Sequence, residues 1–228
     1  MPRAPHAVAH SPRERAARLR ITEIFHSLQG EGRTTGLPTA FVRLTGCPLR
    51  CRYCDTEYAF HGGRIMEVDE ILARVRDQGA RHVTVTGGEP LAQPDCLALM
   101  RRLCDEGYAV SLETGGALDV SVVDPRVSIV LDLKTPGSGE VDRNLYANLE
   151  HLAPKDQIKF VLCDRRDYEW AVSCLAEHAL ARRCEVLFSP AHGGLEPVRL
   201  AEWILADRLE VRLQVQLHKL LWGDVPGR

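Results

Sequence analysis

The sequence predicts an α/β fold built on an open, largely parallel sheet. Apolar runs of strand length alternate with segments of helical periodicity along most of the 228 residues, which is the pattern of βαβ units. Several runs end in glycine or polar residues, as strands do where a parallel sheet carries a ligand site. The runs are too few to close an eight-stranded barrel, so we expect a partial, open TIM-type β/α barrel of about six parallel strands. A cysteine-containing loop follows its first strand.

The strands are predicted from apolar runs that turn residues bound. We expect them at Arg20–Phe25, Thr39–Leu44, His82–Thr86, Tyr108–Glu113, Val127–Asp132, Gln157–Leu162, Cys184–Phe188 and Val211–Gln216.

The helices are predicted from apolar residues that recur at intervals of three and four. The first two carry the stripes Val68–Ile71–Leu72–Val75 and Leu97–Met100–Cys104, and further helical patterns lie near Asn144–Leu152, Tyr168–Ala179 and Pro197–Ala206.

The chain is expected to form one domain over residues 20–228, preceded by a disordered basic tail over residues 1–19. The first twenty residues contain five arginines but no continuous apolar segment, so they do not resemble a secretory signal. An arm that touches RNA is the alternative for this tail. Because the net charge is −2 and the apolar runs have only strand length, we expect no nucleic-acid or membrane partner.

Eight cysteines are present, and they indicate a reducing compartment rather than a disulfide scaffold. Without an export signal we expect the protein in the cytoplasm. Five of the eight lie within apolar periodic segments, where a free cysteine behaves as a small core residue; these are Cys96, Cys104, Cys163, Cys174 and Cys184.

The other three cysteines, Cys47, Cys51 and Cys54, have the spacing C-x3-C-x2-C. A [4Fe–4S] cluster normally takes four cysteine ligands, so three leave one iron open to a small molecule. The alternative is a structural zinc site, for which His61 would supply the fourth ligand. Zinc sites usually pair two C-x2-C knuckles, whereas this chain has one. The spacing therefore favours a cluster-binding loop over zinc.

Glycine and polar residues end four of the predicted strands. Ligands in parallel α/β folds bind at the carboxyl ends of strands, where glycine lets the backbone approach them closely. The four strand ends are Thr86–Glu89, Glu113–Gly116, Asp132–Lys134 and Ser189–Pro190.

The cysteine spacing and Thr86-Gly87-Gly88-Glu89-Pro90 together resemble the radical S-adenosylmethionine superfamily. Within it, the chain from about Ile21 onward resembles the 7-carboxy-7-deazaguanine synthase (QueE) family of the queuosine and 7-deazapurine pathway, which serves tRNA modification. The segments that carry this second resemblance are Glu23–Phe25, Ser27–Gly32, Phe41–Arg43, Cys54–Thr56 and Gln216–Lys219.

The resemblance implies a reaction and its cofactors. In that family S-adenosylmethionine chelates the open iron through its amino and carboxylate groups, and one electron from the cluster then yields a 5′-deoxyadenosyl radical. The substrate 6-carboxy-5,6,7,8-tetrahydropterin is converted to 7-carboxy-7-deazaguanine with loss of ammonia, supported by Mg2+. S-adenosylmethionine is regenerated. The resemblance also implies a homodimer and an electron donor such as flavodoxin or ferredoxin.

The resemblance assigns residues to each ligand, position by position. No side chain is expected to be catalytic in itself, because the radical forms on the cofactor. Cys47, Cys51 and Cys54 would hold the cluster, and Thr56 would bind Mg2+. S-adenosylmethionine would contact Tyr53, Asp55, Gly88, Glu89, Glu113, Asp132, Leu133, Lys134, Ser189, Pro190, Ala191 and His192. The pterin would contact Leu28, Gln29, Gly30, Glu31, Arg43, Thr86 and His218.

Two other functions remain open at this point. A radical activase would use the same cluster to place a glycyl radical on a partner protein, but it would need neither Arg43 nor Thr56. A zinc-stabilised binding module would be no enzyme at all. The chain also departs from the family at Gly115, where asparagine is expected.

Overall fold

A single nine-stranded sheet organises the computed structural model, which describes residues 17–223, 225 and 227. The spatial order of the strands is β3-β1-β2-β4-β5-β6-β7-β8-β9, and the sheet stays open. In chain order the strands are β1 (Arg18–Leu28), β2 (Pro38–Leu44), β3 (Arg64–Glu67), β4 (His82–Gly87), β5 (Ala109–Thr114), β6 (Ser128–Asp132), β7 (Gln157–Leu162), β8 (Glu185–Pro190) and β9 (Arg212–Leu213). The open α/β prediction is confirmed.

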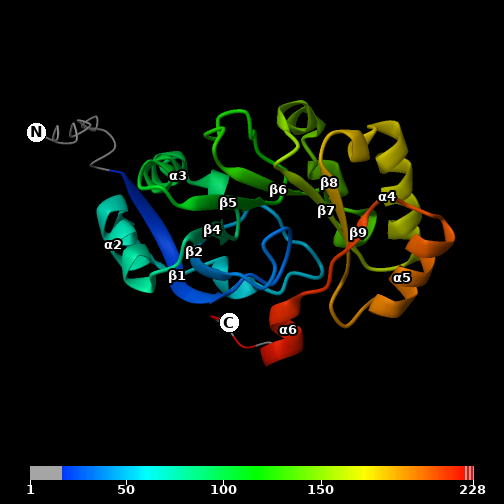
Figure 1. Ribbon diagram of the computed structural model, residues 1–228, viewed down its shortest axis with the longest axis horizontal. Coiled ribbons are helices and arrows are strands. Elements are labelled where there is room, and N and C mark those ends of the chain that lie inside the picture. The colour runs from blue at the N-terminus through cyan, green and yellow to red at the C-terminus, as the bar shows by residue number, and fades with distance from the viewer. Residues whose placement is uncertain (1–16, 224, 226, 228) are drawn as a thin grey trace, which may run out of the picture.

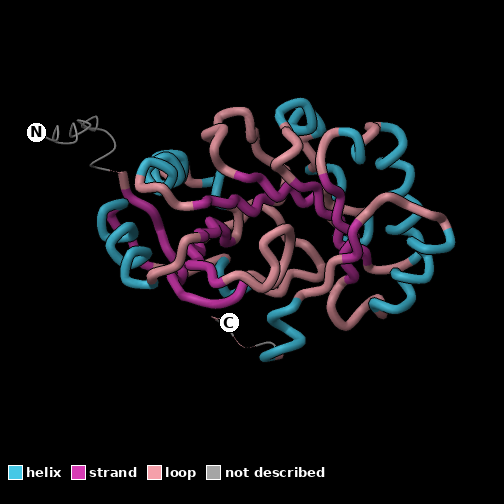
Figure 2. Tube along the Cα trace, in the orientation of Figure 1, coloured by secondary structure: helices cyan, strands magenta, loops and turns pink. Residues whose placement is uncertain are grey.

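Seven strands, β2 and β4 to β9, run parallel, and β1 pairs antiparallel with both β2 and β3. The strands form an arc with the helices on its outside and the cysteine loop on its inside (Figures 1 and 2). The α-helices are α2 (Val68–Gln78), α3 (Cys96–Asp105), α4 (Arg165–Glu177), α5 (Pro197–Ala206) and α6 (Leu217–Trp222).

Local sequence explains where the outer helices begin and end. Asp164 accepts a hydrogen bond from the backbone N–H of Asp167 at 3.0 Å and so caps the start of α4. Pro197 occupies the first turn of α5, where its missing N–H costs nothing. Gly79 ends α2 in the left-handed conformation, with φ of 66°.

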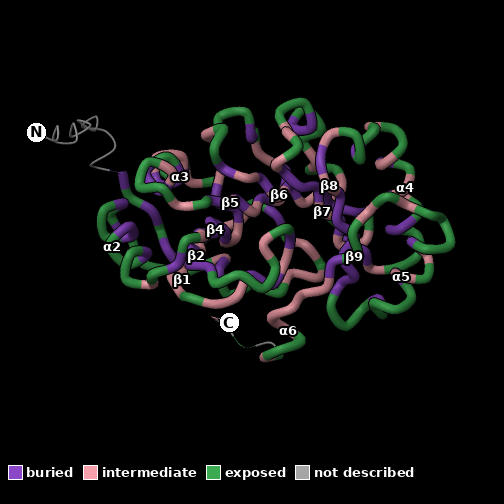
Figure 3. The backbone as a smooth tube through the Cα atoms, in the orientation of Figure 1, coloured by how far each residue is buried: buried purple, intermediate pink, exposed green. Residues whose placement is uncertain are grey.

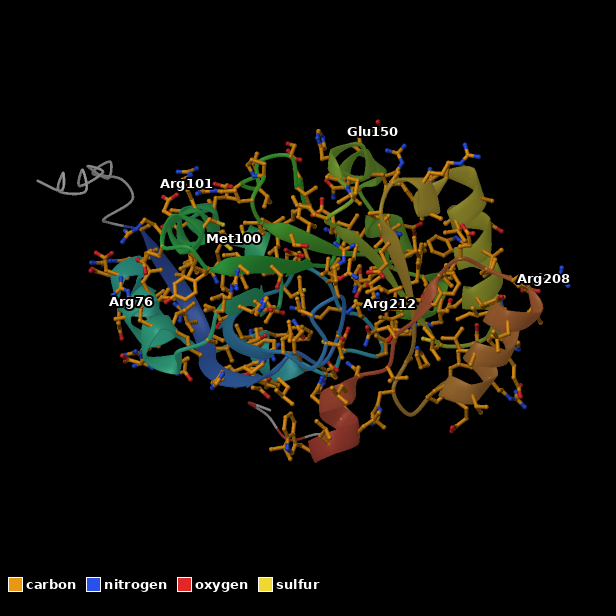
Figure 4. All side chains as sticks on the ribbon, in the orientation of Figure 1. Arg76, Met100, Arg101, Glu150, Arg208 and Arg212 are labelled. Carbon is orange, nitrogen blue, oxygen red and sulfur yellow. The ribbon has the colours of Figure 1, made fainter. Side chains whose placement is uncertain are left out.

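The core lies between the sheet and the outer helices, and Figure 3 shows it as buried backbone along the strands. Phe160 of β7 is fully buried and packs edge-on against Phe188 and Trp170, with ring centroids 5.6 and 6.1 Å apart. Met100 of α3 is also buried, whereas Arg76 and Arg208 are exposed (Figure 4). No helix within the described residues is long and apolar enough to cross a bilayer.

Three elements differ from the sequence prediction. The pattern at residues 144–152 forms a 3-10 helix, Tyr146–His151, because Asn148 faces inward and bonds the loop carbonyls of Gly116 and Leu118. The last strand shrinks to Arg212–Leu213. Strand β3 was not predicted, since three of its four residues are exposed and it lacks an apolar run.

Strand β1 begins at Arg18, two residues inside the range predicted as a tail, and Leu19 is fully buried. Residues 1–16 of the predicted tail lie outside the described residues. The division into a tail and one domain therefore remains a prediction.

Replacing Phe160 by alanine is expected to lower the free energy of unfolding by ~3–5 kcal/mol, because it leaves a cavity between β7 and the outer helices. Urea denaturation measures this change. Leu205→Ala on α5 is the control, since Leu205 is 76% exposed and should change stability by less than about 0.5 kcal/mol. Equal effects of the two variants would contradict this placement of the core.

Candidate active site

A cavity opens at the carboxyl ends of the parallel strands, inside the arc of the sheet. Five consecutive strands, β4 to β8, contribute side chains or backbone to its wall. This is the position at which parallel α/β folds bind ligands. The residues of these five strands that line it are Thr86, Gly87, Glu113, Thr114, Val130, Asp132, Lys159, Val161, Ser189 and Pro190.

The three clustered cysteines line this cavity from the loop that follows β2. Cys47, Cys51 and Cys54 are free thiols of intermediate exposure. The backbone N–H of Leu49 lies 3.4 Å from the sulfur of Cys47, the kind of contact that tunes cluster potentials. The backbone N–H of Arg52 donates to the carbonyl of Ser138 at 3.0 Å, which anchors the loop to the segment after β6.

The chemistry of this donor set fits an iron–sulfur cluster. Burial raises the pKa of all three thiols, that of Cys51 to about 11, while Lys134 opposes the shift. Binding iron therefore requires the loss of three thiol protons. Each cysteine of a cluster binds a different iron. The thiols therefore need to lie around the whole cluster rather than converge on one metal ion.

The zinc alternative does not fit the geometry. His61 is exposed and does not line the cavity. Among residues 17–223, 225 and 227, no three His, Cys, Asp or Glu side chains are gathered as a site for a single metal ion.

The Gly-Gly-Glu-Pro turn after β4 packs directly against the cysteine loop. A Cβ on Gly88 would lie 2.2 Å from the carbonyl oxygen of Gly46, so only glycine permits this approach. The backbone N–H of Glu89 donates to the same oxygen at 2.8 Å. The turn thus holds the cysteine loop in place.

Glu89, predicted to contact S-adenosylmethionine, does not line the cavity. Its carboxylate is fully buried and accepts hydrogen bonds from Leu91 N, Thr114 Oγ1 and Gly115 N at 3.0, 2.9 and 2.8 Å. Burial raises its pKa although these bonds oppose the shift. The carboxylate therefore ties the ends of β4 and β5 together. The backbone of Gly115, where asparagine was expected, is used in this tie.

Two further residues predicted to contact S-adenosylmethionine lie behind the wall. The side chain of Leu133 is fully buried in the core, and that of Ala191 is 4% exposed. Both are small or apolar groups packed away from the cavity. The remaining predicted contacts do line it, namely Tyr53, Asp55, Gly88, Glu113, Asp132, Lys134, Ser189, Pro190 and His192.

Two polar atoms in this wall have no partner within the described residues. Asp132 Oδ1 and Tyr53 OH are both buried and without a hydrogen bond, although the other oxygen of Asp132 pairs with Lys134 Nζ at 3.0 Å. Buried polar groups are nearly always satisfied, so each such exception calls for an explanation. A hydroxyl- and amine-bearing ligand would satisfy both.

The predicted pterin contacts all line the cavity on the side of the loop between β1 and β2; they are Leu28, Gln29, Gly30, Glu31, Arg43, Thr86 and His218. A Cβ on Gly30 would lie 1.9 Å from Nδ1 of His218. This glycine therefore lets the histidine reach the cavity. The sequence suggested that His218 follows the end of a strand. In the structure it lies in the first turn of α6.

The guanidinium group of Arg43 is held in place through its Nε atom. Its Nε donates to Glu23 Oε1 at 2.7 Å, and Tyr58 OH donates to the same oxygen at 2.8 Å. The guanidinium lies 5.7 and 5.8 Å from the ring centroids of Phe25 and Tyr58. Its terminal nitrogens bond no described residue, so both are available to a carboxylate.

Thr56, the predicted Mg2+ ligand, lines the cavity beside the cysteine loop and donates to Asp55 Oδ1 at 2.9 Å. Burial would raise the pKa of Asp55, but Lys219 Nζ at 3.0 Å holds it well below its usual range. Asp55 is therefore ionised next to Thr56.

Sequence reasoning missed Lys159, Gln216 and Lys219 as cavity residues. Lys159 lies in the middle of β7, with Nζ 2.8 Å from Glu31 Oε2 and 3.7 Å from Asp132 Oδ2. A lysine within the otherwise apolar run Ile158–Leu162 was the available signal, because the inward positions of that strand alternate with core positions.

Comparison with known proteins identifies the family of the chain. The model of the radical SAM superfamily matches residues 41–179. The 7-carboxy-7-deazaguanine synthase of Chlorobaculum tepidum is 48% identical over 210 residues, which cover 91% of this chain and 96% of that protein. The enzyme of the same name from Koribacter versatilis is 44% identical and covers 90% of this chain and 97% of its own.

Among solved structures, QueE from Escherichia coli superposes with a TM-score of 0.73 at 28% identity. The alignment covers 90% of this chain and 96% of that one. The fold of this chain is therefore similar to that of QueE over most of both chains. The chain belongs to the 7-carboxy-7-deazaguanine synthase family of the radical SAM superfamily.

Proposed function

We propose that this protein converts 6-carboxy-5,6,7,8-tetrahydropterin to 7-carboxy-7-deazaguanine with loss of ammonia, in the biosynthesis of queuosine and other 7-deazapurines. One observation carries the proposal. Three cysteine thiols and the free end of one arginine open into the same cavity. The first set serves radical chemistry, and the second recognises a carboxylate.

The cofactors are a [4Fe–4S] cluster, S-adenosylmethionine and Mg2+. When bound, the cluster supplies the electron that cleaves S-adenosylmethionine and starts the radical reaction. Cys47, Cys51 and Cys54 would hold it. Asp132 and Tyr53 offer their unpaired polar atoms to S-adenosylmethionine. The Thr56 hydroxyl would take Mg2+, which keeps several waters and needs few protein ligands.

Arg43 would bind the carboxylate of the substrate. Because Glu23 holds Nε, the two terminal nitrogens form a fork of fixed direction. The aromatic rings of Phe25 and Tyr58 flank this fork.

Glu31 would accept N–H groups from the edge of the pterin ring. Burial raises the pKa of Glu31. The ammonium of Lys159 and the hydrogen bonds from Lys159 and Gln216 lower it by more than burial raises it, so the net shift is downward. Glu31 is therefore ionised at neutral pH and acts only as an acceptor.

We further propose a homodimer in the cytoplasm that receives electrons from a flavodoxin or a ferredoxin, with residues 20–228 as its single domain. The free state of all eight cysteines supports a reducing compartment.

The test of the function is an anaerobic reaction of reconstituted protein with 6-carboxytetrahydropterin, S-adenosylmethionine, Mg2+ and dithionite. Mass spectrometry should detect 7-carboxy-7-deazaguanine. Cys51→Ala should abolish both product and 5′-deoxyadenosine, because too few thiolates remain. Cys104→Ala, outside the cavity on α3, is the control. Cleavage of S-adenosylmethionine without any deazaguanine product would refute the substrate assignment.

Arg43→Lys should raise KM for the pterin by about tenfold or more, because an ammonium cannot form the bidentate contact. The KM for S-adenosylmethionine should stay the same. Steady-state kinetics separates the two constants, and Arg199→Lys on α5 is the matched control. A KM within twofold of wild type would show that Arg43 does not bind the carboxylate.

Glu31→Gln should remove a pH-dependent part of the stability. The folded pKa of Glu31 lies below the ordinary value of a glutamate side chain. Its ionised form therefore stabilises the fold above that ordinary pKa, and the stabilisation is lost as the pH falls through the folded pKa. Denaturation from pH 3.5 to 7 should show a wild-type advantage that shrinks toward low pH. A difference that is constant across this range would contradict the assigned ionisation.

A further inference from the structure

The segment at residues 214–219 crosses from β9 to the loop between β1 and β2, and so spans the open side of the sheet. The backbone N–H of Gly32 donates to Gln214 Oε1 at 2.8 Å, and the backbone N–H of Leu217 donates to the carbonyl of Gly30 at 3.0 Å. Figure 1 shows α6 beside the turn that joins β1 and β2. The strand order has no hydrogen bond between β9 and β3. This segment therefore supplies a wall that the sheet itself does not.

Two ion pairs lie close to this segment. Lys159 pairs with Glu31 at 2.8 Å, on the pterin side of the cavity. Lys219 pairs with Asp55 at 3.0 Å, next to the cysteine loop. Each carboxylate thus has its own lysine. Lys159 also lies 3.7 Å from Asp132 Oδ2 on the cofactor side of the cavity.

Gln216 joins these two pairs. Its Nε2 donates to Glu31 Oε1 at 2.8 Å and to Asp55 Oδ2 at 3.2 Å. The two acceptors come from different loops, so the NH2 group of Gln216 links the loop between β1 and β2 to the cysteine loop.

We propose that Gln216 is a positioning residue that sets the separation between Glu31 and the Asp55–Thr56 end of the cysteine loop. The inference rests on the proposed function, in which Glu31 binds the pterin and the cysteine loop binds the cofactors. Hydrogen transfer requires the reacting atoms to lie about 3–3.5 Å apart, and a displacement of 1 Å costs on the order of a hundredfold in rate. A bridge between the two binding loops controls this distance.

The test replaces Gln216 by residues of similar length and different hydrogen-bonding character. Gln216→Met removes the donor, Gln216→Glu adds a third carboxylate, and Gln216→Lys keeps a donor. KM for the pterin should rise by about tenfold in the Met variant and more in the Glu variant, since each bond to a charged group is lost. The Lys variant should stay closest to wild type.

Three further measurements separate positioning from damage to the fold. The ratio of 5′-deoxyadenosine to deazaguanine should rise in the Met and Glu variants, while iron content and the KM for S-adenosylmethionine stay unchanged. Gln78→Glu, at the end of α2 and outside the cavity, is the matched control. Equal ratios in wild type, Met and Glu variants would overturn the proposal.

Hydrogen exchange of the reconstituted enzyme tests the bridge without turnover. In Gln216→Met, peptides that contain residues 28–33 and 51–56 should exchange faster together. This measurement distinguishes a failure of the proposed function from a failure of the proposed bridge. If wild type forms no deazaguanine, the proposed function falls, whereas unchanged exchange in both peptides refutes the bridge whatever the reaction is.

Discussion

The contact between the cysteine loop and the turn after β4 is the constraint on which the site depends. The backbone of Gly46 accepts from Glu89 N at 2.8 Å, and Gly88 leaves no space there for a side chain. Through this contact the loop that carries the cluster thiols is fixed against the strand ends that carry the other ligands. The Glu89 carboxylate extends the same contact to β5 through Gly115. The Gly-Gly-Glu-Pro turn thus joins the cysteine loop to the ends of β4 and β5.

Paired charges define the rest of the cavity. Lys134 and Lys159 both reach Asp132, from the end of β6 and the middle of β7. Buried charges cost little only when they are paired, and the contact of Lys159 with Asp132 links β7 to β6. The pKa values of the two glutamates of this region shift in opposite directions, because burial raises that of Glu113 whereas Lys159 lowers that of Glu31 despite burial.

Much of the fold and of the cysteine loop could be predicted from the sequence, because strand alternation and cysteine spacing are local signals. The helix at Pro197–Ala206 agrees with its prediction at both ends. What could not be predicted depends on distant contacts. Lys159 is a cavity residue only because Glu31, 128 positions away, lies beside it. Glu89 was predicted to contact S-adenosylmethionine because the sequence gives no sign that Thr114 and Gly115 donate hydrogen bonds to its carboxylate.

The contribution of residues 214–219 to the cavity has a consequence for biosynthesis on the ribosome. The chain emerges from its N-terminus, and domains fold as their elements become available. The cysteine loop and strands β4 to β8 precede this segment in the chain, so the residues assigned to the cofactors are synthesised before Gln216 and His218. A chain that stops short of them keeps every residue assigned to the cluster and loses one wall of the substrate half.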